Sequence, residues 1–280
     1  MIRFDARSCF LGEGAFWHPL RQQFFWFDVL EGRLLSRDAS GPLEWRMGRI
    51  ASAAGWVDQD RLLIATETGL VVLDLITGSQ TPLIAVEADT PATRCNDGRA
   101  DRQGGFWIST MGKAAQPGAG TIWRWYRGTL RPLVEGLTIP NAICFAADGR
   151  AAFYTDTPTG KVWRQPLDPQ GWPEGGRALY LDLGPMGLNP DGAVIDSTGA
   201  FCVACWGAGA VLRFDAQGRL LDRIPVGGRH SSCPALGGAE LDQMLVTTAR
   251  EGIADPDPAQ GQTWLVPAPA PGLPEPRIVL

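Results

Sequence analysis

The chain has 280 residues, of which 45% are hydrophobic and 20% are charged, and its formal net charge is -5. This composition excludes a disordered chain, and an acidic balance without a basic cluster argues against nucleic-acid binding. No run of about 18 consecutive apolar residues occurs, so no membrane span and no membrane partner are expected.

Turn-forming residues are spread along the whole length, with 35 glycines and 22 prolines. Short apolar or aromatic runs alternate with turns that contain Gly, Asp or Asn. No long stretch has a convincing helical periodicity. The pattern therefore predicts an all-β fold made of many short strands.

A unit of strand, turn, strand, turn and strand recurs at a spacing of roughly forty to fifty residues. The first copy is GAFWHPLRQQFFWFDVLEGRLLSRD. Taken in chain order, the chain enters the six copies at Glu13, Ala54, Asn96, Asn141, Asp191 and Ser232. Repeats of this size match propeller blades, whose radial arrangement protects the sheet edges. We expect a six-bladed β-propeller of four-stranded antiparallel blades that forms a single domain over residues 1–280.

The two ends of the chain lie outside the six repeats. Residues 1–9 are expected to supply the outer strand of the last blade and so to close the ring. The proline-rich segment 267–280 is expected to be an extended surface tail that ends in a short strand. Arg3, Asp5 and Arg7 stand where a secretory leader needs apolar residues, so a cytoplasmic location is expected.

The six cysteines are scattered, and the one close pair is Cys202 and Cys205. Residues three apart on a strand point to opposite faces, and no second Cys-x-x-Cys supports a zinc or redox site. Reduced, buried cysteines are therefore expected.

Polar residues at the blade starts suggest a site. The innermost strands of a propeller begin near one end of the central channel, so Glu13, Asn96, Asn141 and Asp191 should converge there. Two carboxylates and two amides form a hard oxygen-donor set that suits Ca²⁺, Mg²⁺ or Mn²⁺, with Zn²⁺ or Fe²⁺ also possible. Asp-Gly and Asn-Asp-Gly also form ordinary turns, so each residue alone could be structural.

Five stretches of the chain resemble, in order, the senescence marker protein/regucalcin/gluconolactonase family. The stretches are LGEGAFWHP, TRCNDGRADRQGGFWISTMG, GLTIPNAICFAADGRAAFYTDTPTGKVWR, NPDGAVIDSTGAFCVACWGAGAVLRFD and SSCPALGGAELDQMLVTTA. Together they cover nearly the whole chain. The resemblance implies a lactonase that converts a small sugar lactone, an aldonolactone, to its aldonic acid. It also implies one divalent metal ion, with Ca²⁺ or Zn²⁺ favoured over Mg²⁺, Mn²⁺ or Fe²⁺.

The resemblance also implies roles for particular residues. Glu13, Asn141 and Asp191 would bind the metal, and Asp191 would also act as the catalytic base. Arg94 and Asn96 would bind substrate. Some family members carry a substrate-binding glutamate after the Thr-Met-Gly stretch, whereas here Met111 and Gly112 are followed by Lys113, Ala114 and Ala115.

Other functions on the same fold stay open at this point. They are a calcium-binding regulatory protein, a related hydrolase of organophosphates or other esters, and a protein-interaction scaffold. A scaffold would not need carboxylates and amides at one channel mouth, and no obligate protein partner is evident. His230, just before the sixth blade start, is a further candidate for contact with substrate.

Overall fold

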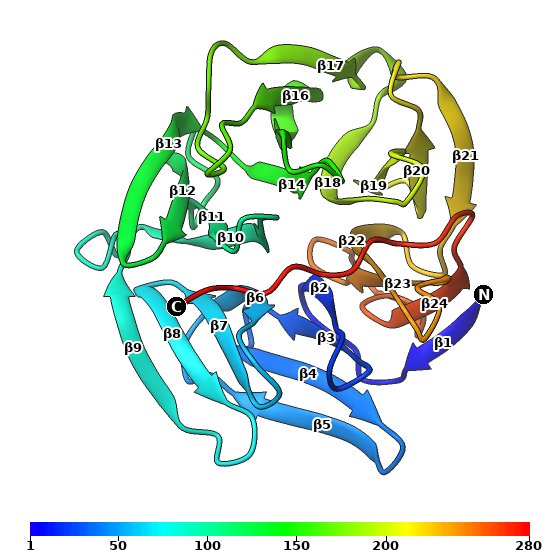
Figure 1. The fold of residues 1–280 in the computed structure, drawn as a ribbon. Helices are drawn as coiled ribbons and strands as arrows, with labels where there is room; N and C mark the ends of the chain where they lie inside the picture. Colours follow the sequence, from blue (N-terminus) through cyan, green and yellow to red (C-terminus); the bar gives the residue numbers. More distant parts are fainter.

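The computed structural model describes residues 1–280 as a closed ring of six four-stranded antiparallel sheets (Figure 1). Its helical elements are two single turns of 3₁₀ helix, η1 (Thr157–Thr159) and η2 (Gly184–Met186). No helix has the length and apolarity needed to cross a membrane. The predicted all-β, six-bladed propeller is confirmed.

Each of the first three blades is built from four consecutive strands, the innermost first. Blade 1 consists of β2 (Gly12–His18), β3 (Gln23–Asp28), β4 (Arg33–Asp38) and β5 (Gly41–Arg46). Blade 2 consists of β6 (Ala51–Trp56), β7 (Arg61–Thr66), β8 (Gly69–Asp74) and β9 (Gln80–Ala85). Blade 3 consists of β10 (Thr93–Ala100), β11 (Phe106–Gly112), β12 (Gly120–Tyr126) and β13 (Thr129–Leu137).

The remaining blades follow the same order, except that the last one also uses the start of the chain. Blade 4 consists of β14 (Pro140–Phe145), β15 (Ala151–Asp156), β16 (Lys161–Pro166) and β17 (Ala178–Asp182). Blade 5 consists of β18 (Asn189–Ile195), β19 (Phe201–Trp206), β20 (Ala210–Phe214) and β21 (Leu220–Pro225). Blade 6 consists of β22 (His230–Gly237), β23 (Gln243–Ala249), β24 (Thr263–Pro267) and β1 (Ile2–Asp5).

The ring is closed by an antiparallel pairing between the two ends of the chain. Strand β1 pairs with β24, with Ile2 opposite Leu265 and Arg3 opposite Trp264. The expectation that the first residues form the outer strand of the last blade is confirmed. Closure removes the exposed edge that an open row of blades would carry.

The core consists of six hydrophobic clusters, one at each interface between neighbouring blades. The largest has 15 buried residues and lies between blades 1 and 2, where Phe16 stacks on Phe25. All six cysteines are buried and free, as predicted. Cys202 packs toward blade 6 and Cys205 toward blade 4, so the Cys-x-x-Cys pair points to opposite faces of β19.

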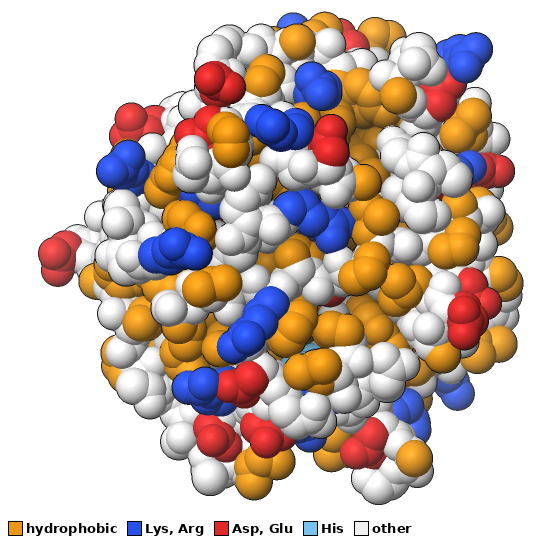
Figure 2. Space-filling model, viewed as in Figure 1, with side chains coloured by type: hydrophobic (Ala, Val, Ile, Leu, Met, Phe, Trp, Pro, Cys, Tyr) orange, Lys and Arg blue, Asp and Glu red, His pale blue; other side chains and the backbone are white.

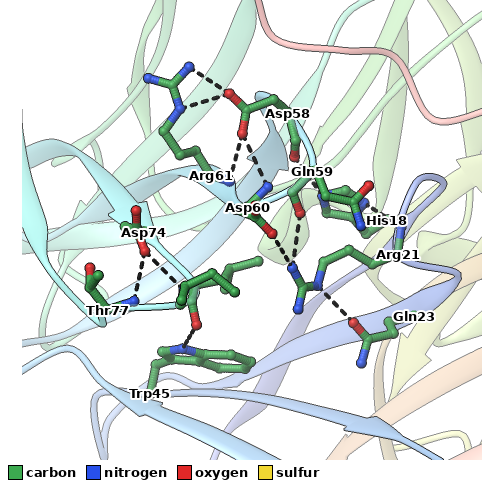
Figure 3. Close-up of polar contacts among 12 residues, drawn as sticks. His18, Arg21, Gln23, Trp45, Asp58, Gln59, Asp60, Arg61, Asp74 and Thr77 are labelled. Atoms are coloured by element: carbon green, nitrogen blue, oxygen red, sulfur yellow. Dashed lines mark hydrogen bonds and ion pairs between the residues drawn. The ribbon is translucent and has the colours of Figure 1, made fainter.

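At the channel end opposite the blade starts, polar contacts join the turns of blades 1 and 2 (Figure 3). His18 Nε2 lies 2.9 Å from the Asp58 carbonyl oxygen, and the Arg21 amide donates to His18 Nδ1. A carbonyl only accepts, so Nε2 carries the proton and the ring is neutral. Arg21 also pairs with Asp60 at 2.7 Å. This histidine therefore has a structural role.

The C-terminal segment crosses the same end of the channel, where it lies over the centre of the ring (Figure 1). The expected final strand is absent, and the segment is not a free surface tail: Ile278 is fully buried against Gly55, where a Cβ would collide with it. Glu275 pairs with Arg99 at 2.9 Å. No β-ladder forms, because the Ile278 amide donates to the Trp56 carbonyl in blade 2, whereas the Val279 amide donates to the Gly104 carbonyl in blade 3. On this face, charges of both signs are mixed (Figure 2).

The buried Ile278 should contribute more to stability than its neighbour. Ile278→Ala removes a fully buried side chain and should lower the free energy of unfolding by about 2–5 kcal/mol in urea titrations. Val279→Ala, at a position that is 38% exposed, is the matched control and should cost less than about 1 kcal/mol. If the two substitutions lowered the free energy of unfolding equally, burial of Ile278 would not stabilise the ring.

Candidate active site

The innermost strands β2, β6, β10, β14, β18 and β22 surround the channel (Figure 1), and five predicted residues meet at the end where these strands begin. They line one cavity of about 480 Å³. They are Glu13, Arg94, Asn96, Asn141 and Asp191. The structure thus brings together the five residues to which the resemblance gives metal, catalytic or substrate-binding roles, whereas His230, the further candidate for contact with substrate, does not line the cavity.

Two of the six predicted blade starts do not reach this cavity. Ala54 belongs to the hydrophobic cluster between blades 1 and 2. Ser232 is fully buried, and its hydroxyl bonds to the Gly12 carbonyl and to Thr247. Neither position was expected to supply a ligand, and neither supplies a polar group to the mouth: Ala54 is apolar, and the neighbouring backbone takes up the Ser232 hydroxyl.

A β-bulge interrupts the innermost strand of each blade close to the channel mouth. In blade 1 the register shifts just after Glu13, in blade 4 just after Asn141, and in blade 5 around Asp191. A bulge re-aims side chains that simple alternation would send elsewhere. Gly14 has a φ of 59°, and a Cβ there would collide with the Ser52 carbonyl, so the turn after Glu13 requires glycine.

Glu13 of blade 1 and Asp191 of blade 5 are far apart in the sequence. Their carboxyl groups nevertheless lie close enough to share a hydrogen bond when one of them is protonated. Burial raises the pKa of Glu13 from its ordinary value of 4.5 to about 8, and the charge of Asp97 adds to this rise. Burial, and next the charge of Glu13, raises the pKa of Asp191 well above its usual range. Two like carboxyls in a low-dielectric site share a proton unless a cation neutralises them.

Asp97 is a third acidic group beside this pair. Its carboxylate accepts hydrogen bonds from the Ile143 and Gly98 amides at 2.7 and 2.8 Å. Burial raises its pKa. Because Asp97 does not line the cavity, it contributes negative potential to the mouth rather than a ligand.

A directed chain of hydrogen bonds links blades 3, 4 and 5 across the mouth. Arg94 donates to Asn96 Oδ1 at 2.9 Å, Asn96 donates to Asn141 Oδ1 at 3.0 Å, and Asn141 donates to Thr157 at 2.9 Å. The Thr157 hydroxyl then donates to the Pro190 carbonyl at 2.7 Å. Arginine only donates and a carbonyl only accepts, so the two ends of the chain fix the orientation of both amides.

These donors can be tested against the needs of a metal ion. Nowhere do three His, Cys, Asp or Glu side chains come together as a metal-binding group. The mouth instead offers two carboxyls, Glu13 and Asp191, and the amide oxygen of Asn141, all hard oxygen donors. Neither acid hydrogen-bonds to Arg94, whose Nη1 bonds to Cys95 and Asn96. The pair therefore lacks a bonded countercharge, and a divalent cation fits it.

The segment after Met111 also lines the cavity, through Lys113, Ala114 and Ala115. Lys113 stands after Met111 and Gly112, where some family members carry a glutamate, and it pairs with Glu67 at 2.7 Å. On the blade 3 side the cavity is therefore lined by two cationic residues, Arg94 and Lys113, of which Lys113 is neutralised by Glu67.

Among the lining residues that sequence reasoning missed are Trp206 and Glu251. Trp206 ends β19, the second strand of blade 5, as Met111 and Gly112 end β11 in blade 3. The endings FCVACWG and FWISTMG align, so the equivalence of second strands could have revealed Trp206. Glu251 lies just after β23, the second strand of blade 6, so the same comparison of second strands could have revealed it. His230 does not line the cavity but stacks on Trp206.

Comparisons with known proteins agree on one family. The SMP-30/Gluconolactonase/LRE-like region matches residues 11–250. An L-arabinolactonase of Azospirillum brasilense is 33% identical, covering 90% of this chain and 84% of its own. A pentonolactonase of Haloferax volcanii is 30% identical, covering 89% and 85%. The crystal structure of a calcium-binding protein, regucalcin, from Agrobacterium tumefaciens has a TM-score of 0.97 at 34% identity, covering 99% and 97%.

The raised pKa of Glu13 makes the stability of the metal-free protein depend on pH. Between about pH 4.5 and 8 the folded protein retains a proton that the unfolded chain releases, so the free energy of unfolding should fall as pH rises. Glu13→Gln should flatten this slope in urea titrations. Glu31→Gln, at an exposed position, should leave it intact. A wild-type stability that rises across this range would contradict the assignment.

Proposed function

Since the chain belongs to the SMP-30/gluconolactonase/LRE-like family, we propose that it hydrolyses a small sugar lactone to the aldonic acid with the help of one divalent metal ion. The observation that carries the proposal is the contact between Glu13 and Asp191, beside Asn141, in a cavity open to small molecules. The names of the arabinono- and pentonolactonase relatives support the substrate class.

Glu13, Asn141 and Asp191 would hold the ion. Their oxygens suit Ca²⁺, and the small number of ligands also suits Zn²⁺, Mg²⁺, Mn²⁺ or Fe²⁺. When bound, such an ion supplies a Lewis acid that polarises the lactone carbonyl. The hydrogen bonds to Asn96 and Thr157 fix which end of the Asn141 amide is the oxygen, and the second lone pair of that oxygen would serve the ion.

Asp191 would act as the general base. Its carboxylate would take a proton from the water that attacks the carbonyl carbon, and would return that proton to the ring oxygen as the ring C–O bond breaks, which releases the aldonic acid and restores the carboxylate. For this step the carboxylate must be ionised, and a nearby cation favours that form by lowering the raised pKa of Asp191.

Arg94 and Asn96 would bind the substrate on the blade 3 side. Nη1 of Arg94 is bonded within the chain, and the rest of its planar fork is available for a ring hydroxyl or the developing oxyanion. Asn96 lies beside it and also holds Asn141, so it joins substrate binding to the metal ligands.

A second candidate function is calcium binding without catalysis. It is favoured by the similarity to the regucalcin of Agrobacterium tumefaciens, which is described as a calcium-binding protein. The same three side chains would hold the ion. Turnover of a sugar lactone that depends on Asp191 separates the two functions.

The ligand assignment can be tested by metal content. Glu13→Gln and Asp191→Asn each remove one anionic donor, and both purified variants should retain at least about tenfold less divalent metal after dialysis than the wild type. Elemental analysis measures this directly. Glu31→Gln, an exposed glutamate, is the control. Full metal content in both site variants would overturn the assignment.

Acid release from a substrate panel tests the reaction. Glucono-, xylono-, arabinono- or galactonolactone should be hydrolysed with higher kcat/KM than a long-chain acyl lactone or a phosphotriester, because buried polar groups penalise apolar ligands. Arg94→Ala should lower kcat/KM on the best lactone by about tenfold or more, with metal content retained. A phosphotriester or acyl lactone that outperforms every sugar lactone would refute the sugar assignment.

A further inference from the structure

One side of the mouth, formed by blades 5 and 6, carries residues that the mechanism does not use. Trp206, at the end of β19, and His230, at the start of β22, stack with ring centroids 4.3 Å apart and an interplanar angle of 7°. Trp206 lines the cavity, whereas His230 does not. Since the imidazole covers one face of the indole, the other face and the edge are left for packing on the neighbouring hydrophobic cluster and for contact with the cavity.

The indole is held in this position from several sides. His230 is 8% exposed, and its Nδ1 has no hydrogen-bond partner. The imidazole therefore supports the indole of Trp206 by stacking. Burial lowers the pKa of His230, which keeps the ring neutral at pH 7. Trp206 also packs against the cluster between blades 1 and 2, and its backbone pairs with Asn189 in the strand that carries Asp191.

Glu251, which follows β23 in blade 6, lines the same cavity as Trp206. The amides of Arg250 and Glu251 both donate to the Phe10 carbonyl, at 3.1 and 3.0 Å, which fixes the backbone at the cavity wall. The Glu251 carboxylate lines the cavity and forms no hydrogen bond or ion pair within the chain. Blade 6 lies opposite blade 3 in the ring, so this free acceptor faces the side that carries Arg94 and Lys113.

An apolar ring face beside an unpaired carboxylate matches the chemistry of a polyol. A sugar presents C–H groups on one face, which pack on an aromatic ring, and hydroxyls at its edge, which donate to a carboxylate. An acyl chain would fit the indole but would leave Glu251 desolvated without a donor, which costs free energy. The two residues together therefore select hydroxylated ligands.

We propose that Trp206 and Glu251 form the subsite for the hydroxylated part of the substrate, with the lactone carbonyl directed toward Asp191. This assignment rests on the lactonase function proposed above. It makes the two residues determinants of specificity: Trp206 binds the C–H face, Glu251 accepts hydroxyl protons, and His230 positions the indole.

The kinetic test compares an aldonolactone with δ-valerolactone, a lactone ring without hydroxyls. Trp206→Ala and Glu251→Gln should each lower the ratio of kcat/KM for the aldonolactone to that for δ-valerolactone by about three- to tenfold, mainly through KM. Trp206→Phe should restore most of the ratio. Trp163→Phe and Glu240→Gln, at positions remote from the cavity, are the matched controls.

A binding test separates this inference from the function on which it rests. Wild-type protein should bind D-glucitol in calorimetry, and Trp206→Ala and Glu251→Gln should weaken binding by about three- to tenfold. If the wild type hydrolyses sugar lactones but the ratio is unchanged in both variants, the subsite is refuted and the lactonase function stands. If glucitol binding depends on both residues but no lactone is hydrolysed, the subsite stands and the lactonase function fails. A wild type that neither binds glucitol nor hydrolyses sugar lactones refutes both.

Discussion

Closure of the ring through the pairing of β1 with β24 is the constraint on which the channel mouth depends. Closure forces the six innermost strands to converge, and this convergence brings Glu13 of blade 1 into contact with Asp191 of blade 5. Burying two acids together costs free energy, as their raised pKa values indicate. The six hydrophobic interfaces between the blades offset that cost.

The two ends of the channel have different roles because of how the strands are joined. At one end, bulges in the innermost strands direct polar side chains into an open cavity. At the other end, the C-terminal segment lies across the ring (Figure 1), and its Glu275 pairs with Arg99 of blade 3. Small molecules can therefore reach the acids from one side, while the tail braces blades 2 and 3 from the other.

Much of the fold and the central site could be predicted from the sequence, because repeat spacing and turn residues are local signals. They placed Glu13, Asn96, Asn141 and Asp191 at one mouth. The side-chain directions at the other two blade starts, Ala54 and Ser232, could not be predicted, because direction near a bulge is set by backbone geometry rather than by position in a repeat. The burial of Ile278 could not be foreseen, since it depends on the missing side chain of Gly55 in a blade far away in sequence. Trp206 was missed although the alignment of second strands carried the signal.

The central claim is that Glu13, Asn141 and Asp191 form one cation site. The most direct test is a crystal structure of the protein grown with Mn²⁺, with the ion located from its anomalous scattering. We expect a single strong peak within coordination distance of the Asn141 amide oxygen and of both carboxylates. A peak elsewhere in the ring, or no peak at the mouth, would contradict the account.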